Sequence, residues 1–322
     1  MKIRRQQDLG DSAISRSTPV SDTGVFSRRE LLRTAFLSAA GLTVASSVAV
    51  PGARADSSPV VGSTSTAFVE VRNGVRIYTQ DWGVGKTIVF VHGWPYSHAM
   101  FDYQTLPLTR AGFRTVAIDL RGFGQSDKPF NGNDFDTWAD DIGKVIRALD
   151  LRDVTLAGFS MGGGISAHYA ATRNDPRVTK LVLMAAAAPA IPPGALDPFI
   201  QAVLTDRAKF TRTFGGLVFF NPVSPEFSEW LEDVGLDASP YAAVRGLEEI
   251  QTRDLTSELR HISIPTLICH GVHDQVVPFA LGQQQQQLIK GATLVPFENS
   301  GHGLFFEEKD LLNQSLATFV GG

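Results

Sequence analysis

Cysteine is almost absent from this chain of 322 residues, because Cys269 is the only one. A single cysteine excludes an internal disulfide, so the fold must be held together by packing alone. Cys269 closes the apolar run Pro-Thr-Leu-Ile-Cys at 265–269. We therefore expect a buried core side chain at this position and not a reactive thiol.

A basic surface is also missing. The chain holds 29 Lys and Arg against 33 Asp and Glu, a formal net charge of −4. Residues 1–55 contain eight of these basic and four of these acidic residues, which leaves 21 against 29 and a net charge of −8 for the remaining 267 residues. A mildly acidic body without a basic run argues against nucleic acid or an anionic membrane as the partner.

The N-terminal region has the composition of an export signal. Arg28 and Arg29 lie in a short basic segment, an uncharged run rich in Ala, Ser, Val and Leu covers 34–52, and Ala-Arg-Ala at 53–55 supplies a small-x-small cleavage site. This order indicates a signal of the twin-arginine type, although Leu31 stands where Phe is common. The alternative is an uncleaved membrane-spanning helix, which the many small and hydroxyl residues disfavour.

This interpretation has consequences for the precursor. We expect it to use the twin-arginine export machinery, to be cleaved near Ala55, and to reach the periplasm or the extracellular space. Residues 56–66 are rich in Ser and are expected to form a flexible leader. One domain is then predicted over 67–322, a length that suits a single large core.

Apolar strands alternate with helices through this domain. The predicted strands are 68–72, 75–80, 87–91, 114–118, 154–158, 180–185, 266–270 and 293–296. The predicted helices are 98–108, 135–149, 165–172, 280–288 and 311–319, with the glutamines at 283–287 expected on a solvated face. Continuous apolar strands between helices predict an α/β fold with a mostly parallel, doubly wound sheet. Asn73-Gly74 predicts an N-terminal antiparallel hairpin at its edge.

Strand-like runs are missing between residues 190 and 261. Proline pairs and Asn-Pro or Ser-Pro steps instead separate helical pieces such as 197–210 and 241–256. We interpret this segment as a helical lid inserted after a sheet strand.

The pattern Gly-x-Ser-x-Gly occurs at 158–162, between the strand 154–158 and the helix that follows. A serine at the tip of such a turn has a strained backbone, and its small neighbours let the strand and helix approach closely. We expect Ser160 to project from this turn into a cleft. The alternative is a Gly-rich turn with a solvated serine.

A serine nucleophile needs a base and an acid that orients the base. His302 lies between glycines in a loop after the last strand, and Asp274 follows the preceding strand. The chain order Ser160, Asp274, His302 is typical of one arrangement of these three groups. His92 also follows a strand, but its loop is early in the chain.

Other roles were weighed for the same residues. His302 could cap its loop, and Asp274 could cap the helix after it. Asp119, in a glycine-containing loop after another strand, is the second candidate for the acid, although a scaffold role suits it better. His270 and His273 could bind a metal with Asp274, but no third site stands nearby.

Two backbone groups are candidates for stabilising an oxyanion. The N–H of Met161, directly after the serine, is the first. The second is expected from the loop at 92–95, where Pro95 has no N–H and Trp94 is therefore the best-placed donor. Pro95 also constrains where the Trp94 carbonyl points.

These motifs together resemble a known family. Residues 68–319 are similar to an α/β-hydrolase of the cofactor-free (non-heme) haloperoxidase and aryl esterase group. The segments that carry the resemblance are His-Gly-Trp-Pro at 92–95, residues 119–126, Gly-Phe-Ser-Met-Gly-Gly at 158–163, Asp274, and Ser-Gly-His-Gly at 300–303. The resemblance implies Ser160 as nucleophile, Asp274 as acid and His302 as base, with Trp94 and Met161 as oxyanion donors and no heme, metal or other cofactor.

The resemblance also implies a substrate class. Small carboxylic esters or lactones would form an acyl-enzyme, and a proline at the place of Pro95 goes with perhydrolysis, in which hydrogen peroxide replaces water and the released peracid oxidises halide. Ser160 argues against the related dehalogenases and epoxide hydrolases, which have aspartate at the elbow. Two alternatives stay open: another α/β-hydrolase chemistry such as carbon–carbon bond hydrolysis, and a non-catalytic binding protein on the same fold.

Overall fold

The computed structural model describes residues 65–322, so the expected export signal and most of the expected leader lie outside the described residues. The first strand, β1, is Ser65–Glu70. It begins two residues earlier than the domain boundary expected from the sequence, because Ser65 and Thr66 pair with Asp81 and Gln80 of the next strand.

The centre of the fold is an eight-stranded sheet with the order β1-β2-β4-β3-β5-β6-β7-β8. The remaining strands are β2 Arg76–Trp82, β3 Thr87–Val91, β4 Arg114–Ile118, β5 Val154–Phe159, β6 Val178–Met184, β7 Thr266–Gly271 and β8 Thr293–Phe297. The pairs β1–β2 and β2–β4 are antiparallel and all the others are parallel. The predicted fold class, a mostly parallel sheet with an antiparallel hairpin at one edge, is therefore confirmed.

The hairpin turns where the sequence predicted it. A short 3₁₀ turn, η1 Arg72–Gly74, joins the two strands, and Asn73 and Gly74 have φ values of 61° and 75°. Two successive residues with positive φ match the right-handed twist of the strands, and Asn-Gly adopts them with little strain.

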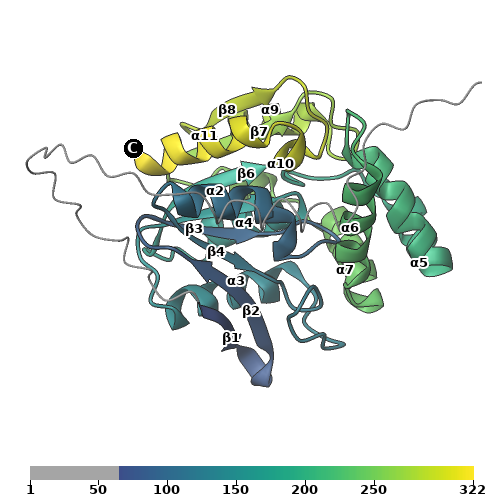
Figure 1. Cartoon of the computed structure of the whole chain (residues 1–322), viewed down its shortest axis with the longest axis horizontal. Helices are drawn as coiled ribbons and strands as arrows, with labels where there is room; N and C mark the ends of the chain where they lie inside the picture. Colours follow the sequence, from purple (N-terminus) through teal and green to yellow (C-terminus); the bar gives the residue numbers. More distant parts are fainter. Residues whose placement is uncertain (1–64) are drawn as a thin grey trace, which may run out of the picture. The chain divides into compact units, whose positions relative to one another are not determined.

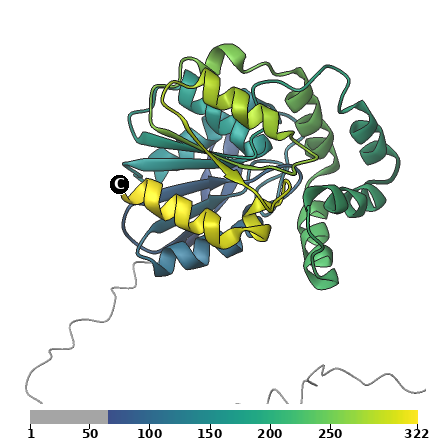
Figure 2. The ribbon, with the colours of Figure 1, turned by 90° about the horizontal axis from the view of Figure 1, so that it is seen from above.

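Helices cover both faces of the sheet, as Figure 2 shows. The helices outside the lid are η2 His98–Phe101, α2 Asp102–Arg110, α3 Phe135–Ala148, α4 Met161–Thr172, α9 Phe279–Leu288, α10 Leu304–Glu307 and α11 Lys309–Gly321. Helices α3, α4 and α9 pack on one face, while α2, α10 and α11 pack together on the other. None of the helices in residues 65–322 is both long and apolar enough to cross a membrane.

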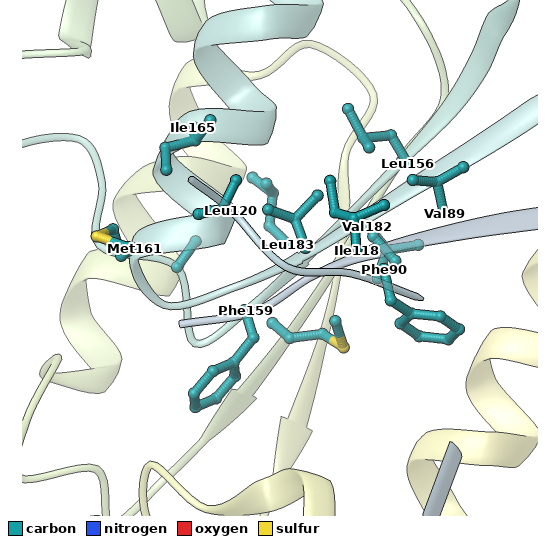
Figure 3. Close-up of a cluster of buried hydrophobic side chains, with 14 of the residues drawn as sticks. Val89, Phe90, Ile118, Leu120, Leu156, Phe159, Met161, Ile165, Val182 and Leu183 are labelled. Atoms are coloured by element: carbon teal, nitrogen blue, oxygen red, sulfur yellow. The ribbon is translucent and has the colours of Figure 1, made fainter. Parts of the chain in front are cut away.

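The core lies along the central strands β3, β4, β5 and β6 (Figure 3). Val89, Leu156 and Val182 are fully buried, and Phe159 and Met161 continue the same cluster to the end of β5. Each such side chain contributes about 1.5–3 kcal/mol on burial, so these strands form a rigid platform. Cys269 is also fully buried, which confirms its predicted place, and burial raises the pKa of its thiol to about 12.

The segment between 190 and 261 is helical, and none of the described strands falls in it. Its helices are α5 Asp197–Val218, α6 Pro225–Leu236, α7 Pro240–Thr252 and α8 Thr256–Leu259. Ser224 and Ser239 cap α6 and α7 through their side chains, and a proline follows each serine at the first helical position. Helices α5, α6 and α7 gather at one side of the sheet in Figure 1, and residues of α5 and α7 line a cavity together with Ser160.

The expectation for the glutamine run was wrong at one position. Gln285 is fully buried, and its amide donates to the carbonyls of Ala186 at 3.0 Å and Ala188 at 2.8 Å, while the other four glutamines are exposed. The helical repeat of 3.6 residues turns one of these glutamines towards the sheet. Gln285 thereby holds the segment that follows β6.

Candidate active site

Ser160 occupies a strained turn between β5 and α4. Its backbone has φ 51° and ψ −117°, a region that residues other than glycine rarely adopt. The turn is possible because Gly158 and Gly162 have no side chains: a Cβ at Gly158 would lie 2.3 Å from the Gly162 carbonyl oxygen. The structure therefore places Ser160 at the tip of a sharp strand–helix turn.

Asp274 and His302 come together in the way that the sequence predicted. The Nδ1–H of His302 donates to Asp274 Oδ2 at 2.7 Å, and Asp274 Oδ1 accepts the N–H groups of Val276 and Val277 at 2.8 Å each. Both side chains are almost fully buried. Burial alone would raise the pKa of Asp274, but the charge of His302 and the hydrogen bonds from His270 and His302 outweigh it and hold this pKa well below its usual range. The carboxylate therefore stays ionised, which keeps the proton of a neutral His302 on Nδ1 and leaves Nε2 as a base.

His302 also lies beside the elbow. Its ring centroid is 4.8 Å from that of Phe159, the residue before Ser160. In the part of the chain that the structure describes, the Ser160 hydroxyl forms no hydrogen bond, so its contact with His302 is not made. In enzymes without bound substrate such contacts are often long and close only in the complex.

The loop after β3 passes directly over Ser160. A Cβ at Gly93 would lie 2.9 Å from the Ser160 Cβ, so only glycine permits this approach. His92 fixes the loop: its Nδ1–H donates to the Gly93 carbonyl at 2.9 Å, and its Nε2 accepts the N–H of Leu120 at 3.0 Å. His92 is fully buried, and burial lowers the pKa of its ring. Since both ring nitrogens are already bonded, His92 is a neutral structural link and not a candidate base.

The two backbone N–H groups predicted as oxyanion donors belong to Met161, directly after the serine, and to Trp94, directly after Gly93. Met161 is the first residue of α4, and the N–H groups of a first helical turn have no partner inside the helix. The N–H of Trp94 has no acceptor among the described residues. The positive end of the α4 dipole adds to the same region. This arrangement suits an anion at the Ser160 side chain.

Pro95 is buried against helix α6 of the lid. The Trp94–Pro95 peptide bond is cis, and the proline ring packs on α6 at Gly235, where a Cβ would lie 3.2 Å from Cγ of Pro95. Pro95 can therefore influence the site only through the position of the Trp94 backbone. The Trp94 indole in turn donates to the Ala243 carbonyl of α7 at 2.7 Å, so this loop is held by the lid.

A narrow cavity of about 30 Å³ opens over Ser160. Apart from Ser160, its lining is apolar and consists of Trp94, Ala187, Ile191, Leu196, Phe199, Phe214, Leu247, Ile250, Val276 and Val277. The sequence analysis did not identify the lid residues of this lining. The sequence signal for these residues is the helical spacing of apolar side chains such as Leu247 and Ile250. Every core-facing helix has this spacing, so it does not distinguish a cavity wall from the core.

A larger cavity of about 320 Å³ lies between α5 and α6. Its lining includes charged side chains such as Arg212 and Glu229, and neither Ser160 nor its neighbours reach it. We place the site in the smaller cavity, because Ser160 lines that one.

Asp119 and His273, two other candidates from the sequence, make their contacts with residues other than His302. Asp119 accepts the N–H of His98 at 2.6 Å, its Nδ1–H at 2.8 Å, and the N–H of Gln125 at 2.7 Å. It therefore holds loops together and does not contact His302. The ring of His273 stacks on Phe220 at 3.8 Å between centroids. Among the described residues, no group of three or more His, Cys, Asp or Glu side chains could hold a metal ion.

Comparisons with known proteins agree with this geometry. The model of a family described as "alpha/beta hydrolase fold" matches residues 86–233. The chain is 42% identical to the AB hydrolase superfamily protein YisY of Bacillus subtilis, over 78% of this chain and 98% of that protein. It is 35% identical to the non-heme chloroperoxidase CPO-A1 of Kitasatospora aureofaciens, over 77% of this chain and 97% of the relative.

A solved structure supports the same placement. An esterase from Exiguobacterium antarcticum superposes with a TM-score of 0.79 at 35% identity, over 80% of this chain and 100% of the esterase. The chain therefore belongs to the α/β-hydrolase family, in the group of the non-heme haloperoxidases and esterases, and is an enzyme of that kind.

Proposed function

We propose that the protein is a serine hydrolase that cleaves small carboxylic esters or lactones through an acyl-enzyme. The observation that carries the proposal is the ionised Asp274 bonded to His302 at 2.7 Å, beside a strained Ser160. The cavity over Ser160 is apolar and about 30 Å³, which suits an acyl group of only a few non-hydrogen atoms.

In the first half-reaction, His302 Nε2 takes the proton of the Ser160 hydroxyl as its Oγ attacks the carbonyl carbon. The N–H groups of Trp94 and Met161 hold the oxyanion that forms, and they need no reorganisation because the backbone already fixes them. Asp274 stabilises the imidazolium. His302 then gives its proton to the leaving oxygen, and the alcohol departs from the acyl-enzyme.

In the second half-reaction, a small nucleophile releases the acyl group. His302 takes a proton from water, the resulting oxygen attacks the acyl carbon, and the carboxylic acid leaves as Ser160 regains its proton. Hydrogen peroxide in place of water yields a peracid, which can transfer oxygen to halide and become the carboxylic acid. Relatives named non-heme chloroperoxidase, and a 32% identical bifunctional esterase/perhydrolase of Acinetobacter calcoaceticus, support this side activity.

The nucleophile is tested by Ser160→Ala. With p-nitrophenyl acetate, we expect kcat to fall on the order of 10⁶-fold, because the variant cannot form the acyl-enzyme. Labelling by a fluorophosphonate probe should disappear. Ser166→Ala is the matched control, since Ser166 is buried farther along α4 and its hydroxyl has no hydrogen bond. Retained esterase activity in Ser160→Ala would reject the assignment.

The choice between water and peroxide is tested at Pro95. Pro95→Leu frees the backbone of the loop that carries Trp94, so we expect the ratio of perhydrolysis to hydrolysis to fall by about tenfold, a difference of about 1.4 kcal/mol between the two barriers. Bromide oxidation in peroxide and acetate, measured beside ester hydrolysis, gives this ratio. An unchanged ratio would show that Pro95 does not decide between water and hydrogen peroxide.

A further inference from the structure

His270 lies beside the turn that carries Asp274, and the reaction described above does not use it. It is the fifth residue of β7 and fully buried. Its Nε2 is 2.8 Å from the carbonyl oxygen of Val277 and 3.4 Å from Asp274 Oδ2. One ring nitrogen thus reaches both ends of the turn that presents the carboxylate.

The surroundings of the other nitrogen decide where the proton lies. Nδ1 of His270 is buried and has no hydrogen-bond partner within residues 65–322, and it faces Gly282 of α9, where a Cβ would lie only 2.7 Å away. A proton on Nδ1 would be a buried donor with no acceptor, whereas a proton on Nε2 meets two oxygens. Of the two neutral tautomers, the one with its proton on Nε2 therefore fits these surroundings.

The turn closed by this donor holds the acid and part of the cavity wall. Asp274 Oδ1 accepts the N–H groups of Val276 and Val277, and the carbonyl of Val277 accepts the proton of His270. The side chains of both valines line the cavity over Ser160. The same small network thus sets the direction of the carboxylate and the position of two apolar wall residues.

We propose that His270 is a positioning residue that holds Asp274 in line with His302 Nδ1. The proposal rests on the serine hydrolase function proposed above. Without this donor, the buried Val277 carbonyl has no partner, and its peptide must rotate to find one. That peptide joins Val277 to Pro278, and its rotation about the Val277 Cα shifts the turn that carries the Val277 N–H. The bond from this N–H to Asp274 Oδ1 then weakens, and the carboxylate moves relative to His302.

The expected kinetic effect lies mainly in kcat. The bond between Asp274 and His302 matters most when the imidazole is charged, which happens in the transition state and not in the ground state. A misplacement of about 1 Å in such a group lowers the rate about 10²-fold. KM should change far less, because most of the apolar cavity lining, such as Trp94, Phe199 and Leu247, comes from other segments.

The test uses three substitutions at one position in the full protein. The amide nitrogen of glutamine reaches about as far as Nε2 of histidine, that of asparagine reaches only as far as Nδ1, and leucine has no donor. We expect His270→Gln to keep kcat within a few-fold, and His270→Asn and His270→Leu to lose about 10²-fold. If the leucine variant does not fold, the two amide variants still give the comparison.

Tyr169→Phe is the control for a purely structural loss. Its hydroxyl donates to Asp175 at 2.8 Å near the end of α4 that is remote from Ser160. We expect Tm to fall as it does in the His270 variants while kcat stays unchanged. Equal kcat in His270→Gln and His270→Asn, or an equal loss in Tyr169→Phe, would overturn the proposal. A parent enzyme without Ser160-dependent turnover would instead reject the proposed function.

Discussion

At the scale of single residues, three histidines with similar sequence surroundings have different roles. His92 and His302 follow a strand, His270 is the last residue but one of β7, and all three are buried. His302 is bonded to Asp274 at 2.7 Å and lies beside Phe159 of the elbow. His92 is bonded to the backbone through both ring nitrogens. His270 has one ring nitrogen that meets no partner in the described part of the chain. The position after a strand therefore identifies candidates, and the hydrogen-bond partners separate them.

The two candidate acids can be separated by substitution. Asp274→Asn leaves the size of the side chain unchanged but removes the charge that orients His302, so we expect kcat to fall about 10⁴-fold with little change in Tm. Asp119→Asn should instead lower Tm and leave kcat nearly unchanged, because that carboxylate accepts three hydrogen bonds from loops. Ester turnover and thermal unfolding measured on both variants provide the test. A kcat lost only in Asp119→Asn would exchange their roles.

At the scale of secondary structure, the predicted bounds of strands and helices are correct where residue propensity agrees with the tertiary contacts. The strands Thr87–Val91 and Arg114–Ile118 have the predicted bounds, because continuous apolar runs are typical of buried parallel strands. Helix α4 instead begins at Met161, four residues earlier than predicted. Its three glycines at 162–164 disfavour a helix by propensity, but close contacts with β3, β5 and the segment after β6 require them.

An ionic contact joins the end of the lid helix α7 to α3, a helix that packs on the sheet. Asp136 of α3 accepts from Arg253 at the end of α7 at 3.0 Å, and from His168 of α4 at 3.0 Å. Burial alone would raise the pKa of Asp136, but the hydrogen bond from Arg253 and the charge of His168 outweigh it and lower the pKa to about 2. The side chain is 57% exposed, so salt screens the contact.

This contact predicts a pH-dependent difference in stability. The pKa of Asp136 is lower in the folded state than in the unfolded state. The ionised carboxylate therefore adds to the free energy of unfolding above the unfolded pKa of about 3.9, and this stabilisation is lost as the pH falls through about 2. We expect Asp136→Asn to lower Tm slightly at pH 7, and this difference to shrink between pH 4 and pH 2. Asp140→Asn, on the same helix but bonded to α4, is the control. A difference that grows in acid would contradict the prediction.

At the scale of the whole molecule, the fold brings distant segments to one end of the sheet. Ser160 follows β5, Asp274 follows β7, His302 follows β8, and the loop that carries Trp94 follows β3. The carboxyl ends of parallel strands meet at one edge, which is where open α/β sheets place their sites. The lid helices lie over this edge and supply much of the apolar lining.

The export signal is also a property of the whole chain, and it stays a prediction because residues 1–64 lie outside the described part. Replacing both Arg28 and Arg29 by Lys should leave the precursor in the cytoplasm, since the twin-arginine machinery reads that pair. Replacing Arg4 and Arg5 by Lys is the control. Fractionation and the mass of the exported protein check this, with cleavage near Ala55 leaving 267 residues. Equal export of both variants would exclude this route.

The sequence by itself determined the sheet, the elbow and the order of the three reactive groups, because each depends on local patterns: apolar runs, glycine spacing and the residue types after strands. Only the tertiary structure decided that His270 also approaches Asp274, that Pro95 packs on α6, that Gln285 is buried, and which lid residues form the cavity. These depend on contacts between segments far apart in the chain. The periodicity of one helix shows which face is apolar but not what that face meets.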